Sequence, residues 1–114
     1  MKIYHNPRCS KSRCALDYLK TSNFTFEVRD YMKEPFTATE LREVLTALNY
    51  QPSDLLRKNE EEYKNHIQGK ELTEDQIFDF LLQFPKLIER PIVVWDSHAV
   101  VARPLEKLTD LLDV

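Results

Sequence analysis

The first thirty residues change from a two-residue hydrophobic period to a helical one and back again. Apolar and polar positions alternate over Lys2–His5, which predicts a short strand. An Asn-Pro break follows, and residues 10–19 then carry Leu16 and Leu19 at helical spacing. Residues 24–29 alternate again, so a second strand is expected there. Because a helix joins the two strands, they are expected to lie parallel in a βαβ unit.

Two capping boxes mark the starts of helices in the middle of the chain. In each, a threonine precedes a glutamate or glutamine by three residues, at Thr37–Glu40 and at Thr73–Gln76. Apolar residues at helical spacing follow both boxes, and the second pattern ends at Pro85. Residues 51–66 between them are polar and irregular, which predicts only short helical turns.

The last part of the chain has the pattern of a hairpin followed by a helix. Two apolar runs, 91–95 and 98–102, are separated by Asp96 and Ser97, which predicts an antiparallel pair of strands joined by a tight turn. Pro104 precedes leucines at helical spacing, so a final helix is expected to start there.

The order of these elements predicts one α/β domain. It is βαβ, then a block of helices, then ββα, and the strands at the two ends match a four-stranded mixed sheet of the thioredoxin type. The helices between strands 2 and 3 are predicted to form an insertion over about residues 37–89. At 114 residues the chain is long enough for one compact core, so a single domain over residues 1–114 is expected.

Composition and charge narrow the range of functions. The net charge of −3 and the pI near 5.6 argue against a general nucleic-acid or anionic-membrane binder. The single glycine, Gly69, excludes a glycine-rich nucleotide-binding loop. Neither the apolar segment of a signal peptide nor a run of about eighteen apolar residues is present, so a cytoplasmic location without a membrane span is expected.

The most distinctive chemistry lies at Cys9, at the junction of the first predicted strand and helix. Unpaired N–H groups and partial positive charge at a helix N-terminus favour a thiolate and bind oxyanions. Arg8, Lys11 and Arg13 add positive potential of the kind that lowers a cysteine pKa into the range of about 3.5–7.5, and His5 at the strand end adds to it. Cys9 is therefore predicted to be a nucleophile. The alternative is a buried thiol between solvated basic residues.

The second cysteine, Cys14, is a poor disulfide partner for Cys9. A five-residue separation on one helix gives about 7.5 Å of rise, beyond the roughly 7 Å that a disulfide tolerates between Cα atoms, and places the side chains on different faces. A structural disulfide is also not expected in a reducing compartment. We therefore expect Cys14 to be a small residue packed on the first helix, with a functional cysteine pair as the alternative.

No metal site is predicted from the other histidines. His66 and His98 have no second histidine, cysteine or acidic pair at ligand spacing beside them, so they are expected to be a surface residue and a strand residue. The large apolar side chains of Trp95, Phe84 and the leucines are expected in the core.

Four motifs, in order along the chain, resemble those of one protein family. They are His5–Arg13, Leu55–Asn59, Glu89–Val94 and Arg103–Pro104. Together they span essentially the whole chain. The chain closely resembles the glutaredoxin-coupled arsenate reductase family (ArsC-like), and within it the short YfgD-type branch. This resemblance implies a thioredoxin-like fold with a helical insertion.

The resemblance also implies the members of an active site. Cys9 matches the nucleophile of the family, His5 matches the histidine near the thiolate, and Ser12 matches a nearby hydroxyl. The residues that match the oxyanion-binding arginines are Arg57, Arg90 and Arg103. The alternative for each arginine is an ion pair with a neighbouring glutamate.

The reaction implied by the resemblance is the reduction of arsenate or a similar oxyanion. Glutathione is the implied co-substrate and glutaredoxin the implied protein partner, with no bound cofactor, no metal, and no contact with nucleic acid or membrane. A monomer is expected. Arg90 precedes Pro91 where thioredoxin-like folds keep a cis proline beside the active cysteine, so a cis peptide bond is expected there.

The chain departs from the family pattern at two positions. Ser10 stands where well-studied members have glycine, and Cys14 does not complete the Cys-x-x-Cys pair of the related Spx regulators. Two other functions stay open, an Spx-like regulatory or interaction protein and a glutathione-linked thiol transferase. The protonation state of His5 is open too, because a charged imidazole would stabilise the thiolate by charge and a neutral one only by hydrogen bonding.

Overall fold

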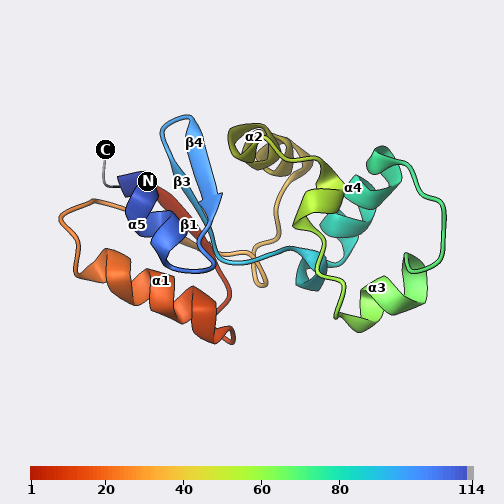
Figure 1. Cartoon of the computed structure of the whole chain (residues 1–114), viewed down its shortest axis with the longest axis horizontal. Helices are drawn as coiled ribbons and strands as arrows, with labels where there is room; N and C mark the ends of the chain where they lie inside the picture. The colour runs from red at the N-terminus through yellow and green to blue at the C-terminus, as the bar shows by residue number, and fades with distance from the viewer. Residues whose placement is uncertain (113–114) are drawn as a thin grey trace. The chain divides into compact units, whose positions relative to one another are not determined.

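The structure, a computed structural model, describes residues 1–112 and divides into two compact units. The sheet unit consists of Met1–Glu34 and the chain from Arg90 onward, and the insertion unit consists of Pro35–Glu89. Figure 1 shows strands in the sheet unit and helices in both units. The expected count of one domain is not decided by this division and stays a prediction.

The sheet unit confirms the predicted α/β arrangement. Its strands are β1 (Lys2–His5), β2 (Glu27–Asp30), β3 (Ile92–Trp95) and β4 (His98–Val101), in the order β2-β1-β3-β4. The pair β1–β2 is parallel, and the pairs β1–β3 and β3–β4 are antiparallel. The helices of this unit are α1 (Ser10–Lys20), between β1 and β2, and α5 (Glu106–Leu112), after β4. The predicted βαβ unit, hairpin and four-stranded mixed sheet are therefore confirmed.

Both helices of the sheet unit pack on the same face of the sheet. Ile3 of β1 and Val93 of β3 are register partners, so their side chains point to one face, and both are fully buried. They share an apolar cluster with Ala15 and Leu19 of α1 and with Leu108 of α5. This packing holds α1 alongside β1, so that the first turn of α1 lies close to the end of β1.

Strand β2 starts later than its sequence pattern predicts. The alternation begins at Phe24, but pairing begins at Glu27, because β1 offers only four residues to pair with. Phe24 and Phe26 are half-buried by side-chain packing instead. Phe24 meets Trp95 edge-on, with 5.3 Å between ring centroids, and Phe26 packs on the apolar cluster. At these positions the alternation of apolar and polar residues therefore reflects side-chain burial and not pairing with another strand.

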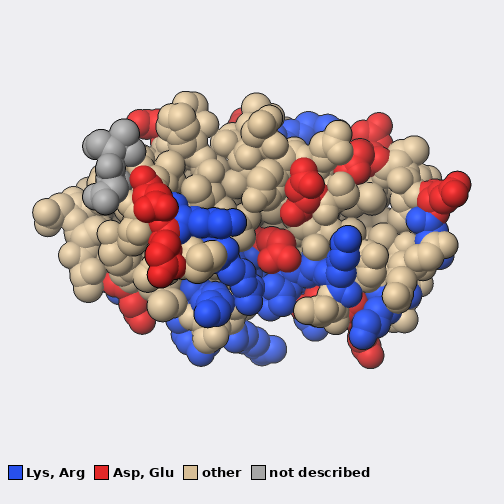
Figure 2. Space-filling model, viewed as in Figure 1, with Lys and Arg blue, Asp and Glu red and all other residues tan. Residues whose placement is uncertain are grey.

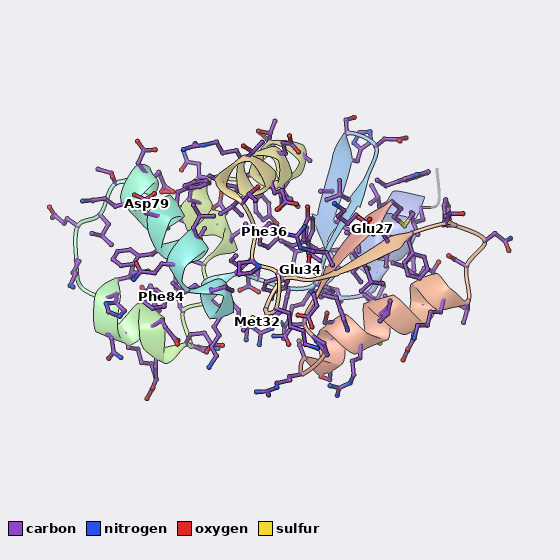
Figure 3. All side chains as sticks on the ribbon, turned by 180° about the vertical axis from the view of Figure 1, so that it is seen from behind. Glu27, Met32, Glu34, Phe36, Asp79 and Phe84 are labelled. Atoms are coloured by element: carbon purple, nitrogen blue, oxygen red, sulfur yellow. The ribbon has the colours of Figure 1, made fainter. Side chains whose placement is uncertain are left out.

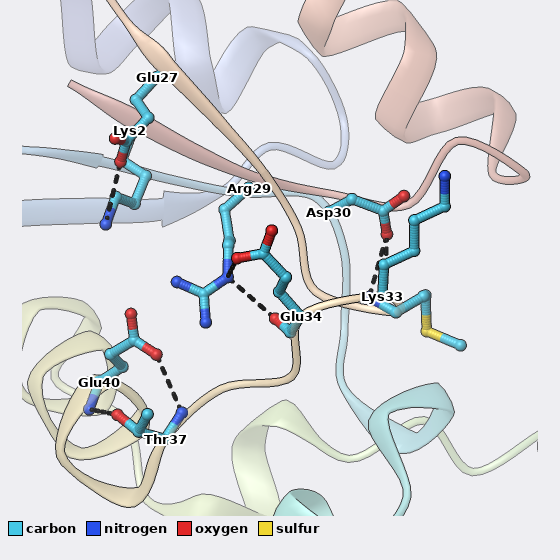
Figure 4. A network of polar contacts seen from close by, with 9 residues as sticks. Lys2, Glu27, Arg29, Asp30, Lys33, Glu34, Thr37 and Glu40 are labelled. Carbon is cyan, nitrogen blue, oxygen red and sulfur yellow. Dashed lines mark hydrogen bonds and ion pairs between the residues drawn. The ribbon is translucent and has the colours of Figure 1, made fainter.

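A set of polar contacts closes the turn after β2 (Figure 4). Arg29 donates from Nε to the carbonyl oxygen of Glu34 at 2.9 Å, and the same nitrogen lies 3.8 Å from the Glu34 carboxylate. Asp30 accepts the backbone N–H groups of Met32 and Lys33 on Oδ1, at 3.1 and 3.3 Å. These contacts fix the carboxylate of Asp30 at the end of the strand.

The insertion unit is helical, as predicted. Its elements are α2 (Ala38–Leu48), η1 (Pro52–Leu55), α3 (Glu61–His66), α4 (Glu74–Gln83) and η2 (Pro85–Leu87). Both predicted capping boxes are present: the Thr37 hydroxyl accepts the N–H of Glu40 at 3.1 Å, the Glu40 carboxylate accepts the N–H of Thr37 at 2.9 Å (Figure 4), and Thr73 and Gln76 form the same pair. None of the helices within residues 1–112 has the length and apolar character needed to cross a bilayer.

Aromatic rings stack between α3 and α4. His66, the last residue of α3, lies over Phe84 with 4.9 Å between ring centroids and over Phe80 with 5.8 Å. Figure 3 labels Phe84, which lies between the two helices. The sequence predicts Phe84 and Trp95 in the core, but both are half-buried, as is His66.

The packed position predicted for Cys14 is wrong, since this side chain is exposed. The buried positions of α1 are Ser12, Ala15 and Leu19, spaced by three and four residues. Successive residues of a helix are about 100° apart, so Cys14 falls outside this buried face. Both cysteines are free thiols.

Candidate active site around Cys9

The loop between β1 and α1 places Cys9 at the start of the helix. Cys9 is the residue before the first helical position, with extended backbone angles of φ −97° and ψ 121°. Its N–H donates to the carbonyl of Asn6, and its carbonyl accepts the N–H of Arg13, both at 3.0 Å. The next N–H groups of α1 have no carbonyl partner within the helix. The predicted location at a strand–helix junction is confirmed.

The surroundings of the Cys9 sulfur favour its ionised form. Burial alone raises the pKa of this thiol. The N–H of Ser12, the side chain of Arg90 and the N–H of Lys11 all hydrogen-bond to the sulfur and lower its pKa, and the charge of Arg90 lowers it further. The net effect is a pKa below the ordinary value. Cys9 is only partly buried, so the thiolate is stabilised without being sealed from reactants.

Ser12 ties the end of β1 to the first turn of α1. Its hydroxyl oxygen lies 2.6 Å from Nδ1 of His5 and accepts the N–H of Asn6 at 2.9 Å. Ser12 is completely buried, and His5 and Asn6 are 5% and 8% exposed. Since the N–H of Ser12 also reaches the sulfur of Cys9, this buried contact positions a group that stabilises the thiolate.

His5 is neutral at neutral pH. Burial lowers its pKa below the ordinary value, and the positive charges of Lys20 and Arg13 act in the same direction. Asp30, its register partner on β2, and the hydrogen bond to Ser12 raise the pKa but do not reverse the shift. Of the two alternatives for His5, the lowered pKa favours the neutral imidazole, which contributes a hydrogen bond to the site rather than a full positive charge.

Two of the three predicted arginines lie in the sheet unit with Cys9. Arg90 precedes β3 and Arg103 follows β4, and the hairpin brings them together: the N–H of Ala102 donates to the carbonyl of Pro91 at 2.9 Å. The guanidinium of Arg103 lies 3.4 Å from the carbonyl oxygen of Arg90. The predicted cis peptide bond at Arg90–Pro91 is confirmed, and Arg103–Pro104 is also cis.

The third arginine, Arg57, lies in the insertion unit between two carboxylates. Its Nε is 3.5 Å from Glu60 and its Nη1 is 3.6 Å from Glu89. Its backbone N–H donates to the carbonyl of Leu87 at 2.7 Å. The alternative of an ion pair with neighbouring glutamates is therefore present in this unit, and the oxyanion-binding role of Arg57 stays a prediction.

One contributor to the site was predicted only in kind and one was not predicted. The backbone N–H groups of Lys11 and Ser12 lower the pKa of the Cys9 thiol, as expected of a helix N-terminus, although the sequence did not single out these two residues for it. Asp30 acts on His5, which parallel pairing of the two predicted strands could have indicated. Ser10, the position of the family glycine, is the first residue of α1 and is exposed. Among residues 1–112, no group of three or more His, Cys, Asp or Glu side chains could hold a metal ion.

These features first define a class of protein. A partly exposed thiol at a strand–helix junction, with a cis-proline segment supplying an arginine to it, belongs to an α/β protein of thioredoxin-like fold. An arsenate reductase from Vibrio cholerae has a solved structure that superposes with a TM-score of 0.89, at 36% identity, over 96% of this chain and 97% of that one.

Sequence comparison then gives the family. The ArsC family pattern matches residues 4–111. The chain is 39% identical to the uncharacterised protein YfgD of Escherichia coli, over 98% of this chain and 96% of that protein. It is 38% identical to an arsenate reductase of Acidiphilium multivorum, over 96% of this chain and 79% of that protein. The chain belongs to the ArsC family, as the sequence motifs predict.

Proposed function

We propose that this protein reduces arsenate, with Cys9 as the nucleophile and with glutathione and glutaredoxin as the source of electrons. The observation that supports this most is the lowered pKa of the Cys9 thiol beside the guanidinium of Arg90. A thiolate next to a guanidinium suits attack on an oxyanion, since the cation attracts the substrate that the sulfur attacks. Arsenate is proposed as the oxyanion because relatives of this chain are named arsenate reductases.

In the first step, the Cys9 thiolate attacks arsenic(V). A sulfur–arsenic bond forms, an arsenic–oxygen bond breaks, and the departing hydroxide takes a proton and leaves as water. Arg90 and Arg103 hold the remaining oxygens and balance their negative charge, because planar guanidinium groups donate paired hydrogen bonds to oxyanions. Arg57 joins them in this proposal on the strength of the family resemblance.

In the second step, the arsenic is reduced by two electrons. The glutathione thiolate attacks the Cys9 sulfur, the sulfur–arsenic bond breaks, and its electron pair remains on arsenic, which leaves as arsenite. Cys9 is then in a mixed disulfide with glutathione. Glutaredoxin attacks the glutathione sulfur, takes up the glutathionyl group and releases the Cys9 thiolate for another cycle.

Arsenite production with purified protein tests this function. Arsenite is measured with glutathione and glutaredoxin together and with each left out, for the unmodified protein, Cys9→Ser and Cys14→Ser. We expect turnover that needs both reductants, is lost in Cys9→Ser and is kept in Cys14→Ser, whose thiol is exposed five residues away. Turnover by Cys9→Ser, or no arsenite from the unmodified protein at any arsenate concentration, would contradict the proposal.

The arginines separate this function from that of a glutathione-linked thiol transferase. Replacing Arg57, Arg90 or Arg103 by alanine is expected to raise the KM for arsenate by about tenfold or more, because each removes a charge-assisted contact to the anion. A thiol transferase would exchange disulfides without needing them. Unchanged arsenate kinetics in all three variants would favour the transferase.

A further inference from the structure

Three exposed basic side chains lie on the loop and the first turn of α1 beside Cys9. Arg8 directly precedes Cys9, and Lys11 and Arg13 lie in the first turn of α1. The guanidinium of Arg13 donates to the carbonyl of Pro7 at 2.9 Å, which holds it against the loop that carries the thiol. Within residues 1–112, none of these three side chains takes part in an ion pair.

This positive charge contrasts with the rest of the chain. Residues 1–20 contain five basic side chains and one acidic one, Asp17, whereas the whole protein carries a net charge of −3. Figure 2 shows Lys and Arg side chains together where Figure 1 places the N-terminal end of α1. Three of the five, Arg8, Lys11 and Arg13, lie at the end of the helix where Cys9 lies.

The main contributions that lower the pKa of the Cys9 thiol come from other groups. The sulfur receives its hydrogen bonds from the backbone N–H groups of Lys11 and Ser12 and from Arg90. The three side chains are instead exposed to solvent, on the loop and the first turn of α1 that carry Cys9. Since all three lie within four residues of Cys9, their field acts on a charged molecule that approaches the thiol.

We propose that Arg8, Lys11 and Arg13 form a cationic rim that selects anionic thiols and disulfides as the molecules that react with Cys9. This inference rests on the proposed function. In that reaction a second thiol attacks the Cys9 sulfur, and the cationic rim would select which thiol does so. The class meant is a thiol or disulfide that carries carboxylates. Cationic and neutral thiols of the same reactivity are disfavoured.

Disulfide exchange with a charge series measures this selection directly. The probes are 3,3′-dithiodipropionate, bis(2-hydroxyethyl) disulfide and cystamine, which are anionic, neutral and cationic at neutral pH. In each case the Cys9 thiolate attacks one probe sulfur, the probe disulfide breaks, and the other half leaves as a thiolate. All proteins carry Cys14→Ser, so that the reaction reports on Cys9 alone.

The quantity compared is the ratio of rates with the anionic and the cationic probe, after each rate is divided by the rate of the same probe with 2-mercaptoethanol, because the two probes release thiols of different pKa and differ in intrinsic reactivity. Any change that the substitutions cause in the ionised fraction of Cys9 acts equally on both probes and cancels in this ratio. The test variant is Arg8→Gln, Lys11→Gln and Arg13→Gln combined. The matched control is Lys107→Gln, an exposed lysine of α5 in the same unit. Unfolding midpoints establish that both variants are folded.

We expect a ratio of about ten or more at low salt for the unmodified protein and for Lys107→Gln. The ratio should fall to near one in the triple variant, and should fall with added salt in the proteins that keep the rim. An unchanged ratio in the triple variant would overturn the proposal, as would a ratio below one for the unmodified protein. Because no arsenate is present, this result is independent of whether the protein reduces arsenate.

Discussion

The ionised state of Cys9 depends on donors of two kinds. The N–H groups of Lys11 and Ser12 belong to the backbone and are present in any protein that forms α1. Arg90 is a side chain from the other end of the sequence, and it acts both by a hydrogen bond and by charge. A substitution removes a side chain but not a backbone N–H group. The pKa of Cys9 can therefore be changed by replacing Arg90.

Replacing Arg90 by alanine should raise the pKa of Cys9. The variant loses one hydrogen bond to the thiolate and one nearby positive charge, both of which lower the pKa. The measurement is the ultraviolet absorbance of the thiolate against pH, in a Cys14→Ser background. The control is Arg103→Ala, whose guanidinium contacts the Arg90 carbonyl and should have a smaller effect. An unchanged or lower pKa in Arg90→Ala would refute this role.

The titration of His5 should occur below the ordinary histidine pKa of about 6.5. Asp30→Asn should lower it further, because the carboxylate raises it, whereas Asp17→Asn on the exposed side of α1 should not. The measurement is NMR titration of the imidazole, assigned by its loss in His5→Gln. A midpoint at or above about 6.5 would contradict the shift.

The same shift makes stability depend on pH in one direction. The folded protein binds the His5 proton less tightly than the unfolded chain does. The contribution of neutral His5 to the free energy of unfolding is thus fully present above about pH 6.5 and is lost as pH falls toward the lower, folded pKa. Urea unfolding at several pH values should show that the free energy of unfolding declines more steeply with falling pH for the unmodified protein than for His5→Gln.

Two serines in the first turn of α1 offer a matched pair of substitutions. Ser12→Ala leaves Nδ1 of His5 and the N–H of Asn6 without their buried partner, so we expect a loss of about 1–3 kcal/mol in the free energy of unfolding. Ser10→Ala, at an exposed position two residues earlier, should change it by less than about 0.5 kcal/mol. Both free energies of unfolding are measured by urea unfolding. Equal losses in Ser12→Ala and Ser10→Ala would show that the buried contact of Ser12 is not the cause.

At the scale of helices and strands, the sequence predicts correctly the elements whose determining residues lie within a few positions of one another. The capping boxes at Thr37 and Thr73 each join a side chain to a backbone three residues away, and both helices start where predicted. The length of β2 depends instead on how many residues of β1 lie opposite it, which no local pattern contains. Helix α5 starts at Glu106 rather than Pro104, because a tighter turn from Pro104 to Lys107 comes first.

Each capping threonine should contribute measurably to stability. Thr37→Ala and Thr73→Ala remove the acceptor of one helical N–H group, and each should cost about 1 kcal/mol. Because the two boxes begin different helices and share no residue, the double variant should cost about the sum. Thr39→Ala, exposed within α2, is the control and should have little effect. Equal losses in Thr39→Ala and Thr37→Ala would show that the cap is not responsible.

At the scale of the whole molecule, the candidate site combines a residue that its sequence neighbours predict with residues that come from distant parts of the sequence. Cys9 could be predicted from its neighbours, because the strand, the break and the helix around it are all local. Arg90 and Arg103 could be assigned only through the family resemblance, since nothing in a single sequence says that the hairpin brings an arginine to a sulfur eighty residues earlier. The role of Arg57 is still a prediction for the same reason.

The position of β1 in the sheet has a consequence for synthesis on the ribosome. β1 is made first, but its neighbour β3 begins only at Ile92, so at about 5–20 residues per second the sheet stays incomplete for roughly 5–20 seconds. Arg90 arrives at the same time as β3. A nascent chain therefore lacks the hydrogen bond and the charge that Arg90 supplies to Cys9, and this part of the lowering of the Cys9 pKa begins only once translation has passed the hairpin.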